Sequence, residues 1–130
     1  MPEPSLIEQW DVAVPANADP EKTYIGRRIA HPSSDDHNDT AVLVRQAGDE
    51  RPLDQRPEQP STAFEWGYRG VGPTALAAAL LADHLGYLPP TLLYFRYRDQ
   101  VVSRLRHDGW GITSSDISAW LAANLTGGRP

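Results

Sequence analysis

The sequence predicts an α+β domain in which a small antiparallel sheet packs against a C-terminal unit of three helices. Short β-branched segments occur in the first half of the chain, and helical spacing of apolar residues dominates the second half. The chain has 130 residues, of which 40% are hydrophobic and 22% charged, enough for one packed core. We expect one domain at residues 21–126, with an extended arm at residues 1–20 and a frayed tail at residues 127–130.

A β-hairpin is expected to open the domain. Thr23–Ile29 alternates weakly, and Ala41–Arg45 is short and β-branched. The polar cluster His31–Thr40 between them is typical of a turn. The following stretch, Gln46–Pro60, is polar and rich in proline, so it is predicted to be an irregular surface connection.

A third strand is predicted over Phe64–Tyr68, where large aromatic residues alternate with Glu65 and Gly67. In a strand, Phe64, Trp66 and Tyr68 share one face. The glycines after this segment would end the strand and lead into a helix.

Three helices are predicted in the second half. The first covers Pro73–Leu85, with proline in its first turn and Gly86 just beyond its end. The second covers Thr91–His107 and stops at Gly109. The third begins at Ser114 or Ser115, and Ile117, Trp120, Leu121, Asn124 and Leu125 follow the spacing of an amphipathic helix.

Composition excludes several classes of protein. The chain contains no cysteine, so disulfides, zinc–thiolate sites and cysteine nucleophiles are excluded. No window approaches the roughly 18 consecutive apolar residues of a membrane span. Met1–Asp11 carries neither a basic leader nor an apolar core, so no secretory signal is expected, and the expected location is the cytoplasm.

The acidic residues are concentrated in the N-terminal half. Residues 1–63 hold 12 Asp or Glu and 6 Lys or Arg, whereas residues 64–130 hold 5 and 6. The net charge of the whole chain is −5. Because contacts with phosphates need a basic surface, this balance argues against a general nucleic-acid-binding protein and leaves room for a local basic site.

The segment Phe64–Pro73 reads Phe-Glu-Trp-Gly-Tyr-Arg-Gly-Val-Gly-Pro. It resembles the Phe-Glu-Trp-Gly-Tyr-x-Gly-x-Gly-Pro signature of a small prokaryotic family of unknown function, with members in bacteria, archaea, plasmids and phages. The resemblance extends from Tyr24 to about Leu121 and includes Tyr24-x-Gly-x-Arg at the first strand. Val71 stands where many relatives carry serine, which removes a hydroxyl from the glycine turn. The resemblance implies a link to mobile elements or viruses and assigns no activity.

The turn Gly70–Pro73 has two interpretations. Backbone N–H groups at the start of a helix, with Arg69 nearby, can hold a phosphate. The turn lacks the lysine of a phosphate-binding loop and has too few glycines for a dinucleotide fingerprint. We therefore favour a tight turn that needs glycine for conformational reasons.

Glu65, His84 and Arg98 form the candidate acid–base group. A carboxylate, an imidazole and a guanidinium could together clamp and hydrolyse a substrate. The alternative is a buried ion pair in which Glu65 or Asp83 neutralises Arg98, while His84 is an ordinary core histidine. We favour the ion pair.

Candidate metal ligands lie in the loop between the first two strands, at His31, Asp35 and His37. Imidazole and carboxylate ligands suit Zn²⁺, Mn²⁺ or Ca²⁺. Their spacing matches neither an EF-hand nor a His-Glu-x-x-His motif, so a solvated loop is favoured and no metal or other cofactor is expected.

The second predicted helix is rich in arginine, at positions 96, 98, 104 and 106. These residues could contact nucleic-acid phosphates or an acidic partner. They spread over more than one helical face, and the connection from Asp108 to Ser115 is too long for a helix-turn-helix motif.

The sequence therefore favours a non-catalytic accessory module that binds a protein partner or a second copy of itself. Nucleic-acid or nucleotide-phosphate binding is the first alternative, and a small hydrolase that uses Glu65 and His84 is the second. The residues expected to contribute to binding are Trp66, Tyr68, Arg69, Gly70, Gly72, Arg96 and Arg98.

Overall fold

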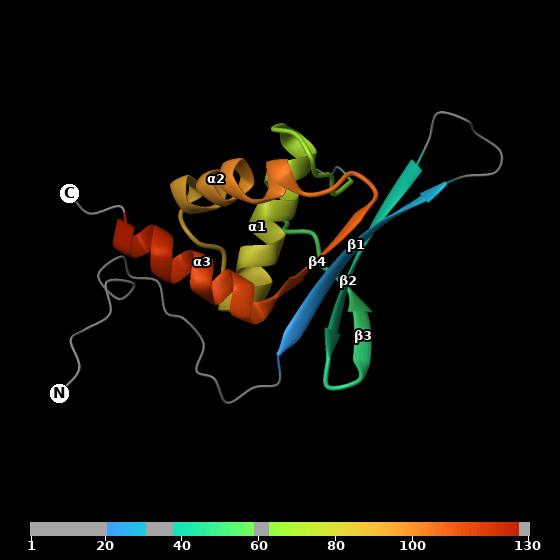
Figure 1. Ribbon diagram of the computed structural model, residues 1–130, viewed down its shortest axis with the longest axis horizontal. Helices are drawn as coiled ribbons and strands as arrows, with labels where there is room; N and C mark the ends of the chain where they lie inside the picture. The colour runs from blue at the N-terminus through green and yellow to red at the C-terminus, as the bar shows by residue number, and fades with distance from the viewer. Residues whose placement is uncertain (1–20, 31–37, 59–62, 128–130) are drawn as a thin grey trace.

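The computed structural model describes residues 21–30, 38–58 and 63–127 (Figure 1). A four-stranded antiparallel sheet has the strand order β3-β2-β1-β4. The predicted α+β class is confirmed. The predicted arm at residues 1–20 and residues 128–130 of the predicted tail lie outside the described residues. The elements are β1 (Lys22–Ala30), β2 (Asn38–Gln46), β3 (Asp49–Pro52), α1 (Val71–Leu85), α2 (Thr91–Gln100), the 3-10 helix η2 (Val102–Arg104), β4 (Gly109–Thr113) and α3 (Ser114–Gly127).

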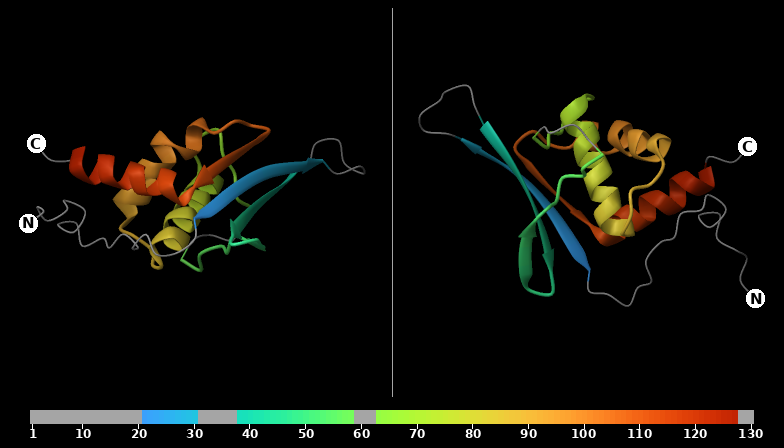
Figure 2. Two further views of the ribbon diagram at one scale, coloured as in Figure 1. Left: turned by 60° about the horizontal axis from the view of Figure 1, so that its bottom comes forward. Right: turned by 180° about the vertical axis from the view of Figure 1, so that it is seen from behind.

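All three α-helices lie on one side of the sheet, with α1 next to the strands and α2 on the far side of α1 (Figure 2). The strands alternate accordingly. Tyr24 of β1 is paired with Val44 of β2 and Ile112 of β4, and all three side chains are buried against the helices. The opposite face of the sheet carries more exposed positions, such as Arg27 and Arg45. The sheet therefore has one covered face and one open face.

Helix α1 forms the centre of the core. Leu76, Leu80 and Leu81 are fully buried, and nearly every other α1 residue is buried too. A helix that is apolar on all sides is one enclosed by the rest of the protein. Gly86 ends it in the left-handed conformation at φ 87°, as the sequence predicts. No helix within the described ranges is long and apolar enough to cross a membrane.

Helix α3 follows its predicted pattern, because Ile117, Leu121 and Leu125 are all fully buried. The second helix is shorter than predicted and ends at Gln100. Val102 lies in η2, and its carbonyl oxygen accepts a hydrogen bond of 3.0 Å from the N–H of Gly67. The chain after α2 therefore holds the aromatic segment in place instead of continuing the helix.

The predicted strand over Phe64–Tyr68 is wrong. The segment runs without strand pairing and is not part of the four-stranded sheet. Two hydrogen bonds that do not belong to the sheet hold its backbone. Thr40 Oγ1 donates to the Phe64 carbonyl oxygen at 2.5 Å, and the Gly67 N–H donates to the Val102 carbonyl oxygen in η2. Gly67 has φ +88°, a conformation that ends any extended run and favours glycine.

Two strands lie where the sequence predicts none. β3 falls in the predicted irregular connection, where the two-residue turn Ala47–Gly48 has positive φ at both positions, 53° and 86°. Such turns suit hairpins, yet alanine is an unusual residue there, so the signal is weak. β4 contains Gly109, which the sequence analysis assigns to a helix end. Its pairing with β1 is supported by Trp110 opposite Gly26.

Candidate functional site

The signature segment is fastened to β1 by an ion pair between Arg28 and Glu65. Arg28 Nη1 and Nη2 donate to the two carboxylate oxygens of Glu65 at 3.1 and 2.7 Å. Arg28 Nε donates to the carbonyl oxygen of His107 at 2.7 Å. The guanidinium lies 4.7 Å from the centre of the Trp66 ring. A bidentate pair that is also stacked fixes both position and orientation.

Trp66 extends this arrangement to β4. Its side chain is 1% exposed, and its indole N–H donates to the same His107 carbonyl at 3.0 Å. Trp66 meets Trp110 edge to face at 5.5 Å between ring centres. Trp110 in turn lies against Gly26 of β1. We call Gly26, Arg28, Glu65, Trp66 and Trp110 the aromatic clasp.

The aromatic clasp leaves its candidate residues little room for ligand binding. Both oxygens of Glu65 are bonded to Arg28. Trp66 is 1% exposed, so its position lends no support to its predicted role in binding. The predicted partnership of Arg98 with Glu65 or Asp83 is wrong, because Arg98 Nε bonds Asp99 at 2.8 Å. The interpretation of Glu65 as half of an ion pair agrees with the structure, with Arg28 as its partner.

Packing explains the glycines of the turn before α1. A Cβ on Gly70 would lie 2.8 Å from the ring of Tyr68, and one on Gly72 would lie 2.7 Å from the Cβ of Glu65. Pro73, in the first turn, has no N–H to offer an anion. The turn therefore fits the favoured interpretation, a tight connection in which neighbouring side chains occupy the space beside the glycines.

His84 lies far from Glu65. Gly72, which packs against Glu65, is twelve residues from His84 on α1, or about 18 Å along the helix axis. His84 is 8% exposed, and its Nε2 is 3.2 Å from Ser118 Oγ. Burial, together with the charge of Lys22, holds the pKa of His84 below its ordinary value. The structure does not bring the two proposed hydrolase residues together.

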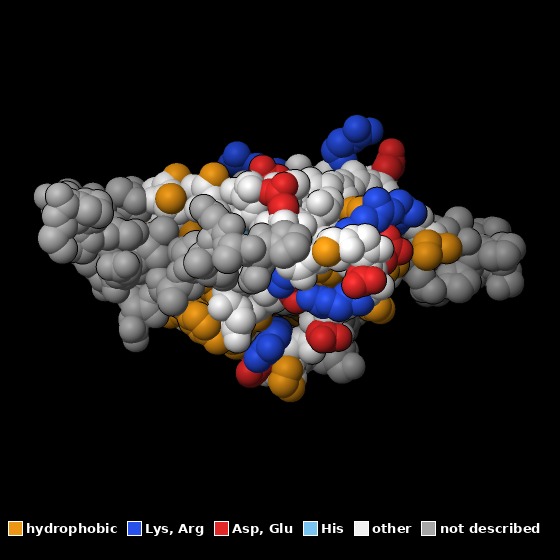
Figure 3. Space-filling model, turned by 90° about the horizontal axis from the view of Figure 1, so that it is seen from below, with side chains coloured by type: hydrophobic (Ala, Val, Ile, Leu, Met, Phe, Trp, Pro, Cys, Tyr) orange, Lys and Arg blue, Asp and Glu red, His pale blue; other side chains and the backbone are white. Residues whose placement is uncertain are grey.

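Asp83 is the centre of a second polar cluster at the same end of α1. Its carboxylate accepts hydrogen bonds from Tyr24 Oη at 2.7 Å, Lys22 Nζ at 3.1 Å and Arg51 Nη2 at 2.6 Å. Burial raises the pKa of Asp83, but these hydrogen bonds outweigh it and leave the pKa below its ordinary value. Figure 3 views the end of the molecule where β1 begins and shows side chains of both signs lying together. The cluster ties α1 to β1 and β3.

The predicted arginine site is partly neutralised. Arg69 Nε lies 3.6 Å from Asp99, which also pairs with Arg98. Arg98 Nη1 donates to Thr74 Oγ1 at 3.0 Å and stacks 4.6 Å from the Phe95 ring centre. Arg98 is thus engaged within the protein. The Arg69 side chain remains 68% exposed.

Exposed apolar side chains gather where α1 begins and along α2. Tyr68, Val71, Leu92 and Phe95 are 51%, 59%, 79% and 37% exposed. The contacts of Arg98 with Thr74 and Phe95 place the first turn of α1 beside α2. Tyr68 packs over Gly70 on one side, and Leu92 precedes Phe95 by one helical turn on the other. We call these four residues the apolar patch.

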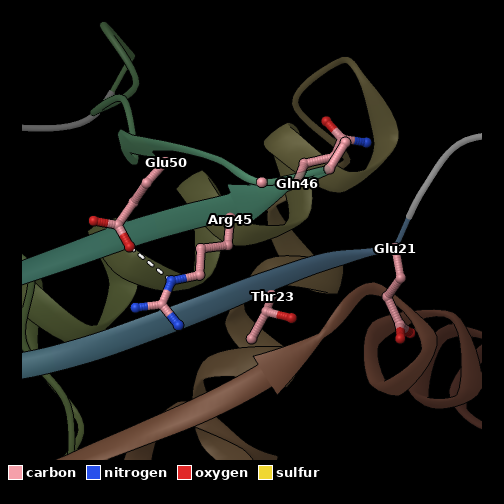
Figure 4. Close-up of a pocket in the computed structure, with 7 residues that line it drawn as sticks. Glu21, Thr23, Arg45, Gln46 and Glu50 are labelled. Carbon is pink, nitrogen blue, oxygen red and sulfur yellow. Dashed lines mark hydrogen bonds and ion pairs between the residues drawn. The ribbon is translucent and has the colours of Figure 1, made fainter.

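An open hollow of about 270 Å³ lies at the end of the sheet beside the β2–β3 turn (Figure 4). Arg45 and Glu50 point toward each other there and bond at 2.7 Å. Both side chains are largely exposed. The hollow is polar and shallow and shows no group of side chains arranged for chemistry.

The predicted metal ligands His31, Asp35 and His37 lie outside the described residues. Among residues 21–30, 38–58 and 63–127, no three His, Asp or Glu side chains lie close enough to hold a metal ion. The candidate metal site therefore stays a prediction from sequence alone.

Sequence reasoning missed several residues of these surfaces. Arg28 was noticed only through the family resemblance, and nothing in its spacing points to Glu65. Leu92 and Phe95 share one helical face, outside the stripe assigned to the core, and this spacing was an available signal. Val71 was noticed only as a departure from the family signature.

Comparison with known proteins places the chain in a family. No curated protein and no solved structure matches it. The model of the family of unknown function DUF6166 matches residues 24–123, which include the whole aromatic clasp and the whole apolar patch. The chain therefore belongs to this family of unknown function, DUF6166.

Proposed function

We propose that the protein is a non-catalytic interaction module that binds a protein partner through the apolar patch. The observation that supports this most strongly is the grouping of Tyr68, Val71, Leu92 and Phe95. They are four of the six large hydrophobic side chains that are exposed in the described part of the chain. Isolated exposed apolar residues are ordinary, whereas four of them on two adjoining elements, on either side of Arg98, support an interaction surface.

The composition of the patch supports the same proposal. Aromatic rings and leucine suit the centre of an interface, and arginine suits its rim. Arg69 is largely exposed beside Tyr68, and Arg96 follows Phe95 on α2. A partner of matching chemistry would present apolar side chains flanked by carboxylates.

The alternatives draw less support. A phosphate site would need convergent cations, whereas Asp99 pairs with both Arg69 and Arg98. A hydrolase would need Glu65 near His84, and the two lie at opposite ends of α1. The aromatic clasp supports the remaining interpretation, in which the signature residues stabilise the fold that presents the patch.

Affinity purification with matched variants tests the proposal. The double variant Leu92→Ser/Phe95→Ser removes the α2 half of the patch, and Ile29→Ser removes a 55% exposed side chain that lies outside it. Both variants should stay folded, because exposed positions tolerate substitution. The double variant should unfold at a lower temperature than Ile29→Ser, since Phe95 is only 37% exposed and stacks on Arg98. We expect the double variant to recover partners at least about tenfold less well, as for residues at the centre of an interface.

The proposal is overturned if the double variant recovers the same proteins as the wild type, or if Ile29→Ser loses them equally. The salt dependence of binding distinguishes this proposal from the phosphate-binding alternative. Binding to phosphates weakens steeply as salt rises, whereas an apolar interface persists. Recovery of nucleic acid that disappears at high salt would favour that alternative.

A further inference from the structure

We infer that residues 1–20 of this chain dock on the apolar patch of the same molecule and compete with the partner for it. The inference rests on the proposed function, because it assigns a regulator to the same surface. It depends on three observations: the charge of the segment and of the patch, the apolar residues of each, and the place where the segment joins the fold.

Residues 1–20 and the border of the apolar patch carry opposite charges. Residues 1–20 contain four acidic side chains and no lysine or arginine; the four are Glu3, Glu8, Asp11 and Asp19. The patch is bordered by Arg69, with its side chain 68% exposed, and by Arg96. Opposite charges at the rim of an interface steer association and suppress wrong partners.

The segment also has suitable apolar side chains. Leu6, Ile7 and Trp10 lie close together among its acidic residues. Tryptophan is a preferred anchor at interfaces, and the rings of Tyr68 and Phe95 offer it an aromatic surface. The segment thus has the chemistry expected of the partner, namely apolar residues flanked by carboxylates.

The segment joins the fold within reach of the patch. It leads into β1 at Lys22, whose ammonium bonds Asp83 near the end of α1. From there the chain passes Gly86 and enters α2, where Leu92 begins the patch. The eleven residues from Asp11 to Lys22 can span up to about 36 Å. For comparison, the full length of α1, with 15 residues, is about 22 Å.

Docking within one molecule would weaken partner binding moderately. A tethered ligand has an effective concentration in the millimolar range, so even weak contacts can fill the site. The apparent affinity for the partner falls in proportion to the fraction of molecules in which the patch is free. We expect the segment to weaken partner binding by about three- to tenfold.

Paramagnetic labelling of the full chain tests the docking directly. The natural sequence has no cysteine, so Ser5→Cys accepts a single nitroxide label. We expect broadening of the amide signals of Val71, Leu92 and Phe95, and none at Ile29. A mixture of labelled natural-abundance chains and unlabelled ¹⁵N chains should show no broadening, because the contact is within one molecule.

Equal broadening at Ile29 and the patch, or none at either, overturns the inference. Broadening of the patch in the mixed sample overturns it as well, since the segment of a second copy would then be the occupant. If the label does not broaden the patch signals but Leu92→Ser/Phe95→Ser loses its partners, the docking is refuted and the proposed function stands. If the label broadens the patch signals but the double variant keeps its partners, the proposed function is refuted and the docking stands.

A variant in the segment connects docking to binding. Leu6→Ser/Trp10→Ser in the full chain should remove the broadening and raise the apparent affinity for the purified partner three- to tenfold. The control Ala13→Ser/Ala16→Ser changes the same segment without its large side chains and should alter neither. An unchanged partner affinity in the first variant contradicts the competitive role.

Discussion

At Gly26 a hydrogen atom stands where any other residue would place a carbon against Trp110. A Cβ there would lie 2.3 Å from the indole Cε2. The indole belongs to the neighbouring strand and also meets Trp66, so it has little freedom to move. One glycine therefore allows the whole aromatic clasp to close.

Gly26→Ala should accordingly lower the free energy of unfolding by about 1–3 kcal/mol, because overpacking forces the indole or the strand to shift. Urea denaturation gives the value. Gly111→Ala is the matched control in the adjacent strand, where the nearest atom to a new Cβ is 4.0 Å away. Equal effects of the two substitutions would contradict the packing explanation.

Glu65→Gln separates a structural role from a catalytic one. Loss of the charge-assisted bonds to Arg28 should cost about 1–3 kcal/mol of unfolding free energy. Glu50→Gln is the control, since its pair with Arg45 is largely exposed and should contribute less than about 1 kcal/mol. A Glu65→Gln protein as stable as the wild type would indicate that the carboxylate serves something other than the fold.

For single residues, the sequence indicates which side chains need an ion-pair partner better than it indicates which residue that partner is. The favoured ion pair joins Arg98 of a helix to Glu65 or Asp83, whereas in the structure Glu65 pairs with Arg28. Arg28 reaches it from a strand 37 positions away in the sequence, and local spacing carries no information about such contacts. Trp66 is predicted to contribute to binding, whereas the fold buries it in the core.

Among the elements, α1 is fastened at both ends. Gly72 packs under Glu65 at its start, and Asp83 near its end binds β1 and β3. The enclosed position of α1 makes these end contacts the link between the sheet and the helical layer.

Acid should weaken this link. Because the folded pKa of Asp83 is depressed, the stability it provides is complete above its unfolded pKa of about 3.9 and is lost as pH falls through the folded value. Asp83→Asn should cost about 1–3 kcal/mol at pH 7, because it removes the charge from the hydrogen bonds with Lys22, Tyr24 and Arg51, and the Arg51 side chain is 45% exposed. The gap between variant and wild type should narrow below pH 4 in urea denaturation. A gap that stays constant with pH would contradict the assignment.

His84 should act in a higher pH range. Its folded pKa is depressed by burial, so the unfolded chain takes up its proton first as pH falls below about 6.5. The free energy of unfolding should then decline between pH 7 and 5, by at most about 1.4 kcal/mol per pH unit from this residue. His84→Asn should flatten that decline. A slope unchanged in the variant would assign it to another group.

End signals and apolar spacing explain which helices were predicted. The proline and glycine that bound α1, and the apolar spacing of α3, both agree with the structure. The strands β3 and β4 are short and contain proline or glycine, so local preference argues against both. The aromatic residues of Phe64–Tyr68 alternate because the segment is held by side-chain contacts. A two-residue alternation of this kind looks the same in the sequence as that of a β-strand.

In the molecule as a whole, the aromatic clasp and the apolar patch occupy different places, although Tyr68 and Val71 of the patch belong to the segment Phe64–Pro73. The aromatic clasp joins β1, β4 and the signature segment, whereas the apolar patch lies over the start of α1 and along α2. Composition and motifs predict an interaction protein, which stays a prediction, and they single out Tyr68 but not the apolar patch as a whole. It arises from residues of two elements that come together only in the folded chain.

Site-specific photo-crosslinking in the native host tests the central claim most directly. A benzophenone amino acid at position 92 would stand in the apolar patch, and the same group at position 29 would stand at an exposed site outside it. The account predicts a discrete crosslinked protein from position 92 and none from position 29. Crosslinks to nucleic acid, or the same products from both positions, would contradict it.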